Sequence, residues 1–293
     1  MNGIINILKP VSLTSFAVVS RVRKLTGAAK AGHGGTLDPL ASGVLPVFLG
    51  KATRLTEYLL EYRKTYRALV QLGVETDSFD AEGVVTKVSD ASGITLEGIN
   101  ASLNCFRGEI SQKPPLYSAV KIAGKPLYKK ARAGETAEIE SRRVVIYRLE
   151  AVSLHDYKLD LVIECSKGTY IRSLAYDLGR KLGCGAHIAG LVRTSYGPFD
   201  IKQAVTLEQL EESVGKGTWA EFVQPMDCVL SSYPKIVLDE EQSRRVANGL
   251  SIKISEVVEG SLLRAYDRES CFLALLVFNS ELGTWSARKV FNG

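Results

Sequence analysis

The sequence predicts an α+β protein that ends in a small β-rich module. Stretches in which every second residue is apolar, as in 65–73, are typical of strands, and they alternate with stretches of helical spacing, as in 167–183. From about residue 231 onward the pattern changes to one short helical stretch among several strands. The length of 293 residues and the hydrophobic content of 45% allow one large domain with a sizeable core and one small domain.

The first part of the chain begins with a strand and a helix whose ends are marked by the sequence. The strand ends at Pro10, and Thr14 or Ser15 caps a helix whose apolar residues share one face until Gly27 stops it. A glycine-rich loop follows and leads through a long apolar stretch into a second helix. The elements predicted in this part are a strand at 3–10, helices at 15–27 and 53–64, strands at 65–73 and 84–89, and a helix at 95–106.

The segment from Lys113 to Arg143 differs in composition from its surroundings. It contains Pro114 and Pro115, few large apolar residues, and many lysines and arginines among tyrosines. Such a segment contributes little to a core, so we expect an extended, mobile insertion. Most insertions of this kind are solvated loops, but basic residues interleaved with tyrosine also bind phosphate backbones and stack on bases.

The rest of the chain carries further strands and helices and a domain boundary at 231–234. One helix has a regular apolar stripe and ends at Gly183, and a later helix is acidic. The elements predicted here are strands at 143–154, 157–166 and 187–200, helices at 167–183, 205–217 and 239–249, and strands at 262–267 and 271–278.

The composition argues against several classes of protein. The net charge of +5 is mild, so local clustering of charge matters more than the total. The five cysteines are widely spaced and odd in number, which argues against a disulfide framework and a zinc site. The N-terminal apolar run is too short for a signal peptide, and no stretch approaches a membrane span. We therefore expect a soluble, cytoplasmic protein that does not enter a membrane.

Motif searches identify no cofactor site. A phosphate-binding loop needs four residues between its first glycine and its Gly-Lys pair, but six residues separate Gly43 from Gly50. His33, His155 and His187 lie far apart in the sequence, which leaves little material for a metal cluster or a Ser-His-Asp triad. The chain is therefore an enzyme without a metal or other evident cofactor, or it is not an enzyme.

The glycine-rich loop holds one carboxylate, Asp38, close to one histidine, His33. Aspartate before proline commonly opens a turn, and this is the more frequent meaning of such a pentapeptide. A carboxylate on a glycine-flanked loop in front of a rigid apolar segment is also how a nucleophile is presented. Arg172 at a strand-to-helix junction, Tyr66 on the inner face of a strand and Lys9 before a proline each have an ordinary structural explanation too.

Taken together, five segments resemble one known family. In chain order they are "GIINILKPVSLTS", "GHGGTLDPLASGVLPV", "ATRLTEYLLEYRKTYRA" with the following "VQLGVETDSFDAEG", "KPPLYSAVKIAGKPLYKKAR", and "CSKGTYIRSLAYDLGRKLGCGAHIAGLVRTSYGPF". The set resembles the bacterial TruB family of tRNA pseudouridine-55 synthases, densely over residues 1–200. Gly-Gly-Thr-Leu-Asp-Pro is its most specific piece, and no position that the family's chemistry requires departs from the pattern.

The resemblance implies a two-part architecture. Residues 1–230 are expected to form a pseudouridine synthase catalytic domain, with a central mixed, largely antiparallel sheet flanked by helices. An RNA-gripping insertion is expected at about 117–141. Residues 231–293 are expected to form a PUA-like RNA-binding module.

The resemblance also implies an activity and a partner. The family isomerises a uridine in the T loop of tRNA, at position 55, to pseudouridine, with the nucleotide flipped out of its stack and an aspartate acting on the ribose. No metal and no other cofactor is implied. The expected partner is the T-arm stem-loop of tRNA, and the protein is expected to be a monomer without an obligate protein partner.

The family's functional residues can be carried over position by position. Asp38 is implied as the nucleophilic carboxylate, Arg172 as its partner, and Tyr66 as the side chain that stacks on the flipped base. Lys9 is implied to support the active-site loop, and His33 to fill the space beside the vacated stack. The residues implied to bind RNA are Lys9, His33, Lys121, Lys125, Lys129, Lys130, Arg132, Tyr170 and Arg193.

Two alternatives belong to other functional classes. One is a non-catalytic chaperone that binds tRNA and helps it fold, and the other is a nucleotide-binding enzyme with a phosphate loop. The presence of Asp38, Tyr66 and Arg172 together favours catalysis over binding alone, and the spacing of the glycines argues against the phosphate loop.

Overall fold

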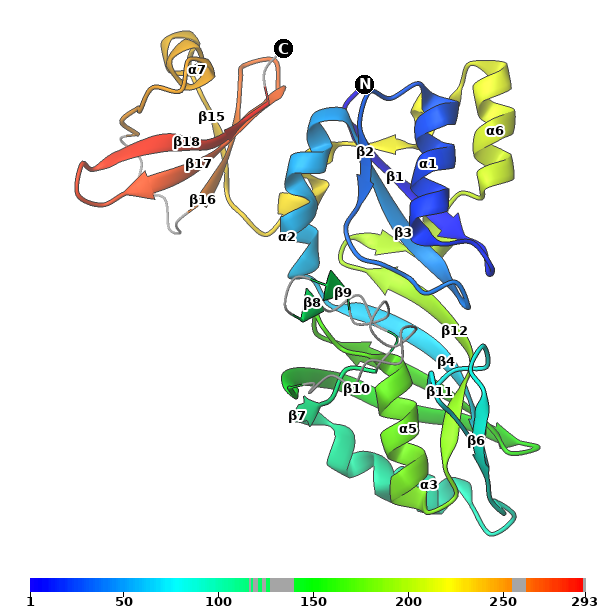
Figure 1. Cartoon of the computed structure of the whole chain (residues 1–293). Helices are drawn as coiled ribbons and strands as arrows, with labels where there is room; N and C mark the ends of the chain where they lie inside the picture. The colour runs from blue at the N-terminus through cyan, green and yellow to red at the C-terminus, as the bar shows by residue number, and fades with distance from the viewer. Residues whose placement is uncertain (116, 118–120, 123–124, 127–139, 255–261, 292–293) are drawn as a thin grey trace.

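The computed structural model describes residues 1–115, 117, 121–122, 125–126, 140–254 and 262–291 (Figure 1). These residues form a ten-stranded sheet, a separate four-stranded sheet near the C-terminus and two two-stranded sheets. Of the predicted insertion, Lys129, Lys130 and Arg132 lie outside the described residues. The backbones of Lys121 and Lys125 belong to the antiparallel strands β8 (Lys121–Ile122) and β9 (Lys125–Pro126).

The large sheet joins strands from almost the whole chain up to residue 224. In spatial order its strands are β14 (Val223–Gln224), β1 (Gly3–Lys9), β3 (Ala41–Leu49), β12 (Ala186–Tyr196), β4 (Lys64–Leu72), β11 (Lys158–Cys165), β10 (Arg142–His155) and β7 (Gly108–Gln112). Two short strands are added at its sides: β2 (Ala31–His33) pairs with β3, and β13 (Phe199–Asp200) pairs with β12.

The strands of this sheet run antiparallel except for one central pair. Strands β3 and β12 are parallel, with Ala41 beside Leu191 and Gly43 beside Arg193, while the other pairings are antiparallel. Gly43 has a φ of +106°, and a Cβ there would lie 2.2 Å from the carbonyl oxygen of Arg193, so only glycine fits. The predicted α+β fold with a mixed, largely antiparallel sheet is confirmed.

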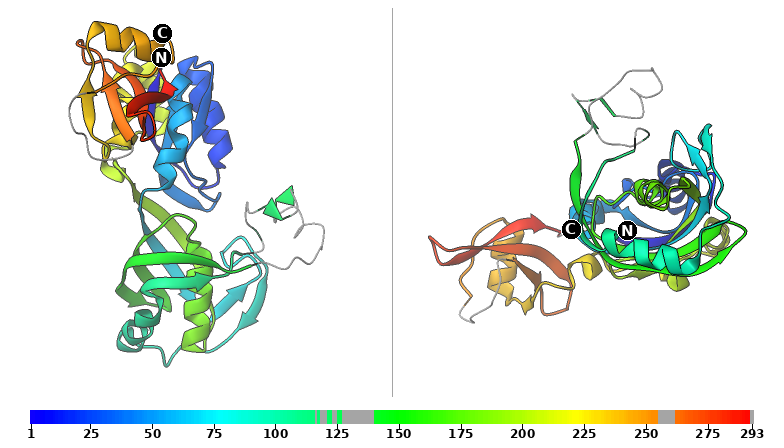
Figure 2. Two further views of the ribbon diagram at one scale, coloured as in Figure 1. Left: turned by 90° about the vertical axis from the view of Figure 1, so that its left-hand side faces the viewer. Right: turned by 90° about the horizontal axis from the view of Figure 1, so that it is seen from below.

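Four helices cover one face of the sheet. They are α1 (Ser15–Thr26), α3 (Leu96–Leu103), α5 (Ile171–Leu182) and α6 (Leu207–Lys216), and their buried residues share one apolar core with the strands. Figure 2 shows the sheet curving around α5. Among the described residues, none of the helices is long and apolar enough to cross a membrane.

Helix ends follow the signals in the sequence. The Thr14 side chain accepts a hydrogen bond from the backbone N–H of Ala17 at the start of α1, and Gly27 ends that helix in the left-handed conformation. Gly183 ends α5 in the same way. These caps agree with the predicted helix boundaries.

The other face of the sheet is covered near β1 and β3. Here the 3₁₀-helix η1 (Gly50–Leu55), the helix α2 (Thr56–Leu60) and the 3₁₀-helix η5 (Met226–Leu230) pack over Ile4, Val44 and Phe48. The predicted helix at 53–64 is therefore shorter than expected, because 3₁₀ geometry takes its first turn and β4 begins at Lys64.

The apolar stretch that follows the glycine-rich loop forms strand β3, which was not predicted from the sequence. Strand β3 is buried on both faces, so its sequence is almost continuously apolar and lacks the alternation that reveals a half-exposed strand. The short β2 pairs with β3 as well, with His33 opposite Val47. The glycine-rich loop is thus confined to residues 34–40.

The C-terminal sheet is small and carries one helix. Its strands are β15 (Lys235–Val237), β16 (Leu262–Tyr266), β17 (Phe272–Asn279) and β18 (Thr284–Val290), and α7 (Glu240–Ala247) packs on it. Leu262, Leu275 and Phe291 share an apolar cluster with Val44 and Phe48 of the large sheet. A second module beginning near residue 231 stays a prediction.

Candidate active site

The loop that carries Asp38 is fixed by hydrogen bonds on both sides. The Oγ of Ser15 donates to the carbonyl of Leu37 at 2.9 Å and accepts from its N–H at 2.8 Å. The N–H of Ser12 donates to the carbonyl of Pro39 at 2.9 Å. Gly35 takes a φ of +143°, which glycine adopts most readily. The carboxylate is therefore presented by a loop with a defined conformation.

Lys9, the last residue of β1, also holds this loop by hydrogen bonds. Its ammonium is buried and donates to the carbonyls of Pro10 at 2.8 Å, Pro39 at 3.3 Å and Ala41 at 2.6 Å. Burial lowers the pKa of Lys9 to about 8, and the negative charge of Asp38 opposes this effect. These contacts fit the implied role of Lys9 as a support of the active-site loop. They turn its ammonium away from solvent, so its predicted contact with RNA stays a prediction.

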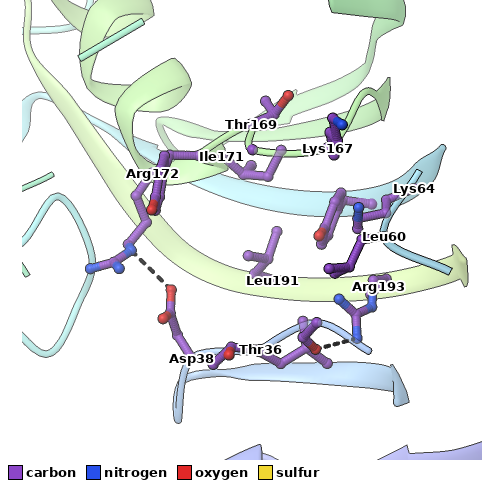
Figure 3. A pocket seen from close by; sticks show the side chains of 15 residues that line it. Thr36, Asp38, Leu60, Lys64, Lys167, Thr169, Ile171, Arg172, Leu191 and Arg193 are labelled. Atoms are coloured by element: carbon purple, nitrogen blue, oxygen red, sulfur yellow. Dashed lines mark hydrogen bonds and ion pairs between the residues drawn. The ribbon is translucent and has the colours of Figure 1, made fainter. Parts of the chain in front are cut away.

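Asp38 and Arg172 form an ion pair, although 134 positions separate them in the sequence (38 to 172). The Nε of Arg172 lies 3.0 Å from Oδ2 of Asp38, as Figure 3 shows. Arg172 lies in the first turn of α5 and is buried, whereas the side chain of Asp38 is 40% exposed. Burial raises the pKa of Asp38, and the guanidinium of Arg172 opposes this by favouring the ionised form. The carboxylate is thus both oriented and accessible.

A second carboxylate, Asp80, binds the other side of Arg172. Its Oδ2 lies 3.1 Å from Nη1 of Arg172, and its Oδ1 accepts from the Oγ of Ser78 at 2.6 Å. The carbonyls of Ser78 and Tyr117 accept from the same guanidinium at 3.2 and 2.8 Å. The guanidinium is therefore held on several sides, which fixes the Nε that faces Asp38.

Asp80 was not predicted as a site residue from the sequence, where it lies in the segment "DSFDAEG". This segment forms a turn, in which the Asp80 side chain also accepts from the N–H of Glu82 at 3.1 Å. Two aspartates in one turn, of which only the second is buried, leave no distinguishing mark in a single sequence. Only the folded chain shows that this turn lies beside α5.

A pocket of about 270 Å³ opens between this ion pair and strands β4 and β12. Figure 3 shows Asp38 and Arg172 at one end, Leu191 and Ile171 along the middle, and Lys64 with Arg193 at the other end. Tyr66 and Tyr170 also line it, and Tyr66 is buried. The pocket therefore has an acidic group at one end, an apolar middle and two cations at the far end.

Tyr66 lies close to one of these cations. Burial raises the pKa of Tyr66, and a hydrogen bond from Arg193 together with its positive charge lowers it. Arg193 also donates from Nε to the carbonyl of Val44 at 2.8 Å and from Nη2 to that of Gly35 at 3.3 Å. Arg193 is therefore a buried wall of the pocket, and its predicted contact with RNA stays a prediction.

His33 and Tyr170 lie at the edges of the site. The Nδ1 of His33 accepts from the N–H of Gly35 at 3.3 Å, and burial lowers the pKa of the imidazole. His33 lines a second, larger pocket of about 670 Å³ on the other side of Asp38 and Arg172. Tyr170 precedes α5, and its backbone N–H donates to the side chain of Gln112 at 2.7 Å.

The described residues offer no cluster of three or more histidine, cysteine, aspartate or glutamate side chains suited to hold a metal ion. What the structure brings together is Asp38, Arg172 and Tyr66 around one pocket, with Lys9 behind the loop. The side chains of Lys121 and Lys125 are not described, and the other basic residues of the insertion lie outside the described part.

Comparisons with known proteins identify the family of the chain. The family model described as "TruB family pseudouridylate synthase (N terminal domain)" matches residues 23–171, and "tRNA pseudouridylate synthase B C-terminal domain" matches residues 172–231. The chain belongs to the TruB family of pseudouridylate synthases. The two TruB models meet at Arg172, at the start of α5, and neither covers the C-terminal sheet.

Two relatives of this TruB-family chain match it over more than nine-tenths of its length. It is 47% identical to tRNA pseudouridine synthase B of Dehalococcoides mccartyi over 99% of this chain and 97% of that protein. It is 46% identical to tRNA pseudouridine synthase B of Stutzerimonas stutzeri over 94% of this chain and 91% of that protein. The family assignment thus extends through the C-terminal sheet.

Solved structures resemble this TruB-family chain over 99% of its length. One is an H/ACA RNP bound to a substrate RNA containing 2′-deoxyuridine, with a TM-score of 0.75, 27% identity and 85% of that chain covered. Another is a Cbf5–Nop10–Gar1 complex, with a TM-score of 0.73, 29% identity and 84% of that chain covered. The fold of this chain is therefore shared with these proteins.

Proposed function

We propose that this protein isomerises uridine to pseudouridine in tRNA, at position 55 of the T loop. The observation that carries the proposal is the partly exposed carboxylate of Asp38, oriented by a buried Arg172 at one end of a pocket lined by Tyr66. Membership of the TruB family and the names of its bacterial relatives supply the reaction and the substrate.

The chemistry begins at the ribose of the target uridine. The N1–C1′ bond breaks, and its electron pair leaves with the base while positive charge develops on the sugar. Asp38 stabilises that charge, either by bonding to C1′ or by removing a proton to give a glycal. When C5 bonds to C1′, Asp38 is released, C5 loses its hydrogen and N1 gains one, so the reaction needs no net proton or electron.

The target nucleotide has to leave its stack to reach Asp38. Flipping a base costs about a few kcal/mol, and contacts in the pocket offset this cost. The pocket of about 270 Å³ suits one nucleobase, with Tyr66 against the base and Leu191 and Ile171 along the apolar middle. His33 lines the neighbouring pocket, and its role in this proposal is to fill space that flipped nucleotides vacate.

The remaining parts are assigned roles within the same proposal. The basic insertion at about 117–141 grips the RNA backbone, and residues 231–293 act as a PUA-like module on the far end of the arm. The protein works as a monomer in the cytoplasm without an obligate protein partner. A chaperone that only binds tRNA would not need a carboxylate held by the network of Arg172 and Asp80.

The decisive test replaces the carboxylate. Asp38→Asn keeps the size of the side chain but removes its negative charge, so we expect no pseudouridine in a T-arm stem-loop while RNA binding is retained. Pseudouridine mapping measures the product, and a filter-binding titration measures affinity. Arg67→Met serves as the matched control, because Arg67 is exposed on the opposite face of β4 and pairs with Asp160. Full turnover by Asp38→Asn contradicts the proposal.

A further inference from the structure

The end of the pocket opposite Asp38 holds two buried cations. Lys64 and Arg193 have only 9% and 1% of their surface exposed, yet both line the pocket. The ammonium of Lys64 lies 4.5 Å from the ring centroid of Tyr196, and the guanidinium carbon of Arg193 lies 4.8 Å from the same centroid. Both positive charges therefore lie against the same aromatic ring.

Neither cation is neutralised by a carboxylate within the part of the chain that the structure describes. Lys64 makes a long contact of 3.5 Å with the carbonyl of Tyr62, and Arg193 donates to backbone carbonyls. Glu61, which influences Lys64 from a distance, pairs with Lys167 at 2.7 Å. Burying two cations without a negatively charged partner costs free energy of folding. Because both cations line a pocket, we expect an anion to bind there.

The proposed reaction generates such an anion. When the N1–C1′ bond breaks, its electron pair stays on the base and gives a uracil anion, with the charge spread over N1, O2 and O4. The ribose has to lie at Asp38, so the base extends along the apolar middle toward the other end of the pocket. Preorganised donors at the position where charge develops are among the largest contributions to catalysis.

We infer that Lys64 and Arg193 stabilise the uracil anion that forms when the glycosidic bond breaks. This inference rests on the proposed function and adds the groups that receive the leaving base. The charge disappears when C5 bonds to C1′ and Asp38 regains its electron pair, so the cations favour the separated intermediate over the bound substrate.

The same cations are poorly placed for the phosphate backbone. A phosphate stays hydrated and bridges to the next nucleotide, so we expect its contacts to come from exposed side chains such as Lys167, which also lines the pocket. Lys64 and Arg193 are buried, at the end of the apolar middle opposite Asp38. A base that has left its stack extends to this buried end, whereas the backbone that carries it does not.

The test separates the rate of the chemical step from RNA affinity. Lys64→Met keeps the length of the side chain and removes the charge, and Lys64→Arg restores a charge. With RNA saturating, we expect Lys64→Met to lower the single-turnover rate of pseudouridine formation by about 10²-fold, as for loss of one oxyanion donor. The Kd for the stem-loop and its salt dependence should stay unchanged, and Lys64→Arg should recover much of the rate.

Arg193→Lys, which keeps the second charge, should retain more activity than Arg193→Met.

Three results overturn the inference. An unchanged rate in Lys64→Met shows that its charge does not act on the base. A weaker Kd with a smaller salt slope and an unchanged rate assigns Lys64 to a phosphate instead. Absence of pseudouridine with the unaltered protein overturns both the proposed function and the inference. The first two results, obtained while the unaltered protein turns over normally, overturn the inference alone.

Discussion

Single residues give the pocket opposite charges at its two ends. Asp38 lies at one end, and Lys64 with Arg193 lies at the other, with Leu191 between them. Breaking the glycosidic bond places positive charge on the ribose, which faces Asp38, and negative charge on the base, which faces Lys64 and Arg193. The pocket is thus complementary to the separated state rather than to the neutral uridine, which is how electrostatic catalysis works.

The buried charge of Lys64 lowers the free energy of unfolding, and this effect can be measured. Burial lowers the pKa of Lys64 to about 8 from an unfolded value of 10.5, so the folded protein binds its proton less tightly. Below pH 8 the full penalty is present, and stability recovers as pH rises from about 8 to 10.5. Lys64→Met should therefore be more stable at pH 7, by up to about 3 kcal/mol, and the gain should shrink toward pH 10.

Thermal unfolding of both proteins between pH 7 and pH 10 measures this difference. Lys216→Met is the control, because Lys216 is an exposed lysine that pairs with Glu212 on the surface of α6. A lower melting temperature for Lys64→Met at pH 7 contradicts the prediction. A more stable but slower enzyme also shows that its loss of rate is not caused by misfolding.

Residues with a distinctive local pattern could be predicted, and residues defined by tertiary contacts could not. Asp38 follows Gly-Gly-Thr-Leu, and the resemblance to a family locates its partner Arg172. Asp80 and Lys64 carry no local mark, since one lies in an ordinary turn and the other begins an ordinary strand. Their importance comes from burial beside other charges, which a single sequence does not display.

Among the elements, the ends of helices were easier to predict than the central strands. Caps such as Thr14 and Gly27 are local hydrogen-bond and backbone effects, so they can be seen in the sequence. Strand β3 was missed because burial on both faces removes the alternation of apolar and polar residues. Its parallel pairing with β12 depends on a close approach at Gly43, which is a property of the fold.

The basic insertion is the element for which charge alone supports a prediction. Removing the charges of Lys129, Lys130 and Arg132 should weaken binding of the stem-loop and flatten its salt dependence. If all three contact phosphates, the slope of log K against log salt should become less negative by about 2 to 3. Binding titrations at several salt concentrations measure this slope, with Arg67→Met as a control. An unchanged slope places the contacts with phosphates elsewhere.

At the scale of the whole molecule, the two sheets share part of their core. Leu275 and Phe291 belong to the same apolar cluster as Val44 and Phe48, and the guanidinium of Arg54 donates to the carbonyl of Val290 at 2.6 Å. A module tied to the large sheet in this way keeps a fixed position relative to the pocket. A substrate that contacts both parts is then bound without the entropic cost of ordering a linker.

This shared core predicts that the two sheets unfold together. Trp285 lies in β18, and replacing Trp219 by phenylalanine leaves it as the single tryptophan reporter of the small sheet. In a denaturant titration, the fluorescence of Trp285 and the circular dichroism of the whole chain should give coincident transitions.

Phe291→Ala removes a side chain that is 4% exposed, so it should destabilise the docked state by about 3 to 5 kcal/mol and separate the two transitions. An exposed replacement in the turn between β17 and β18, Leu282→Ala, should leave them coincident. If Trp285 unfolds at lower denaturant in the unaltered chain, the small sheet is an independent unit, and its position relative to the pocket is set only when RNA binds.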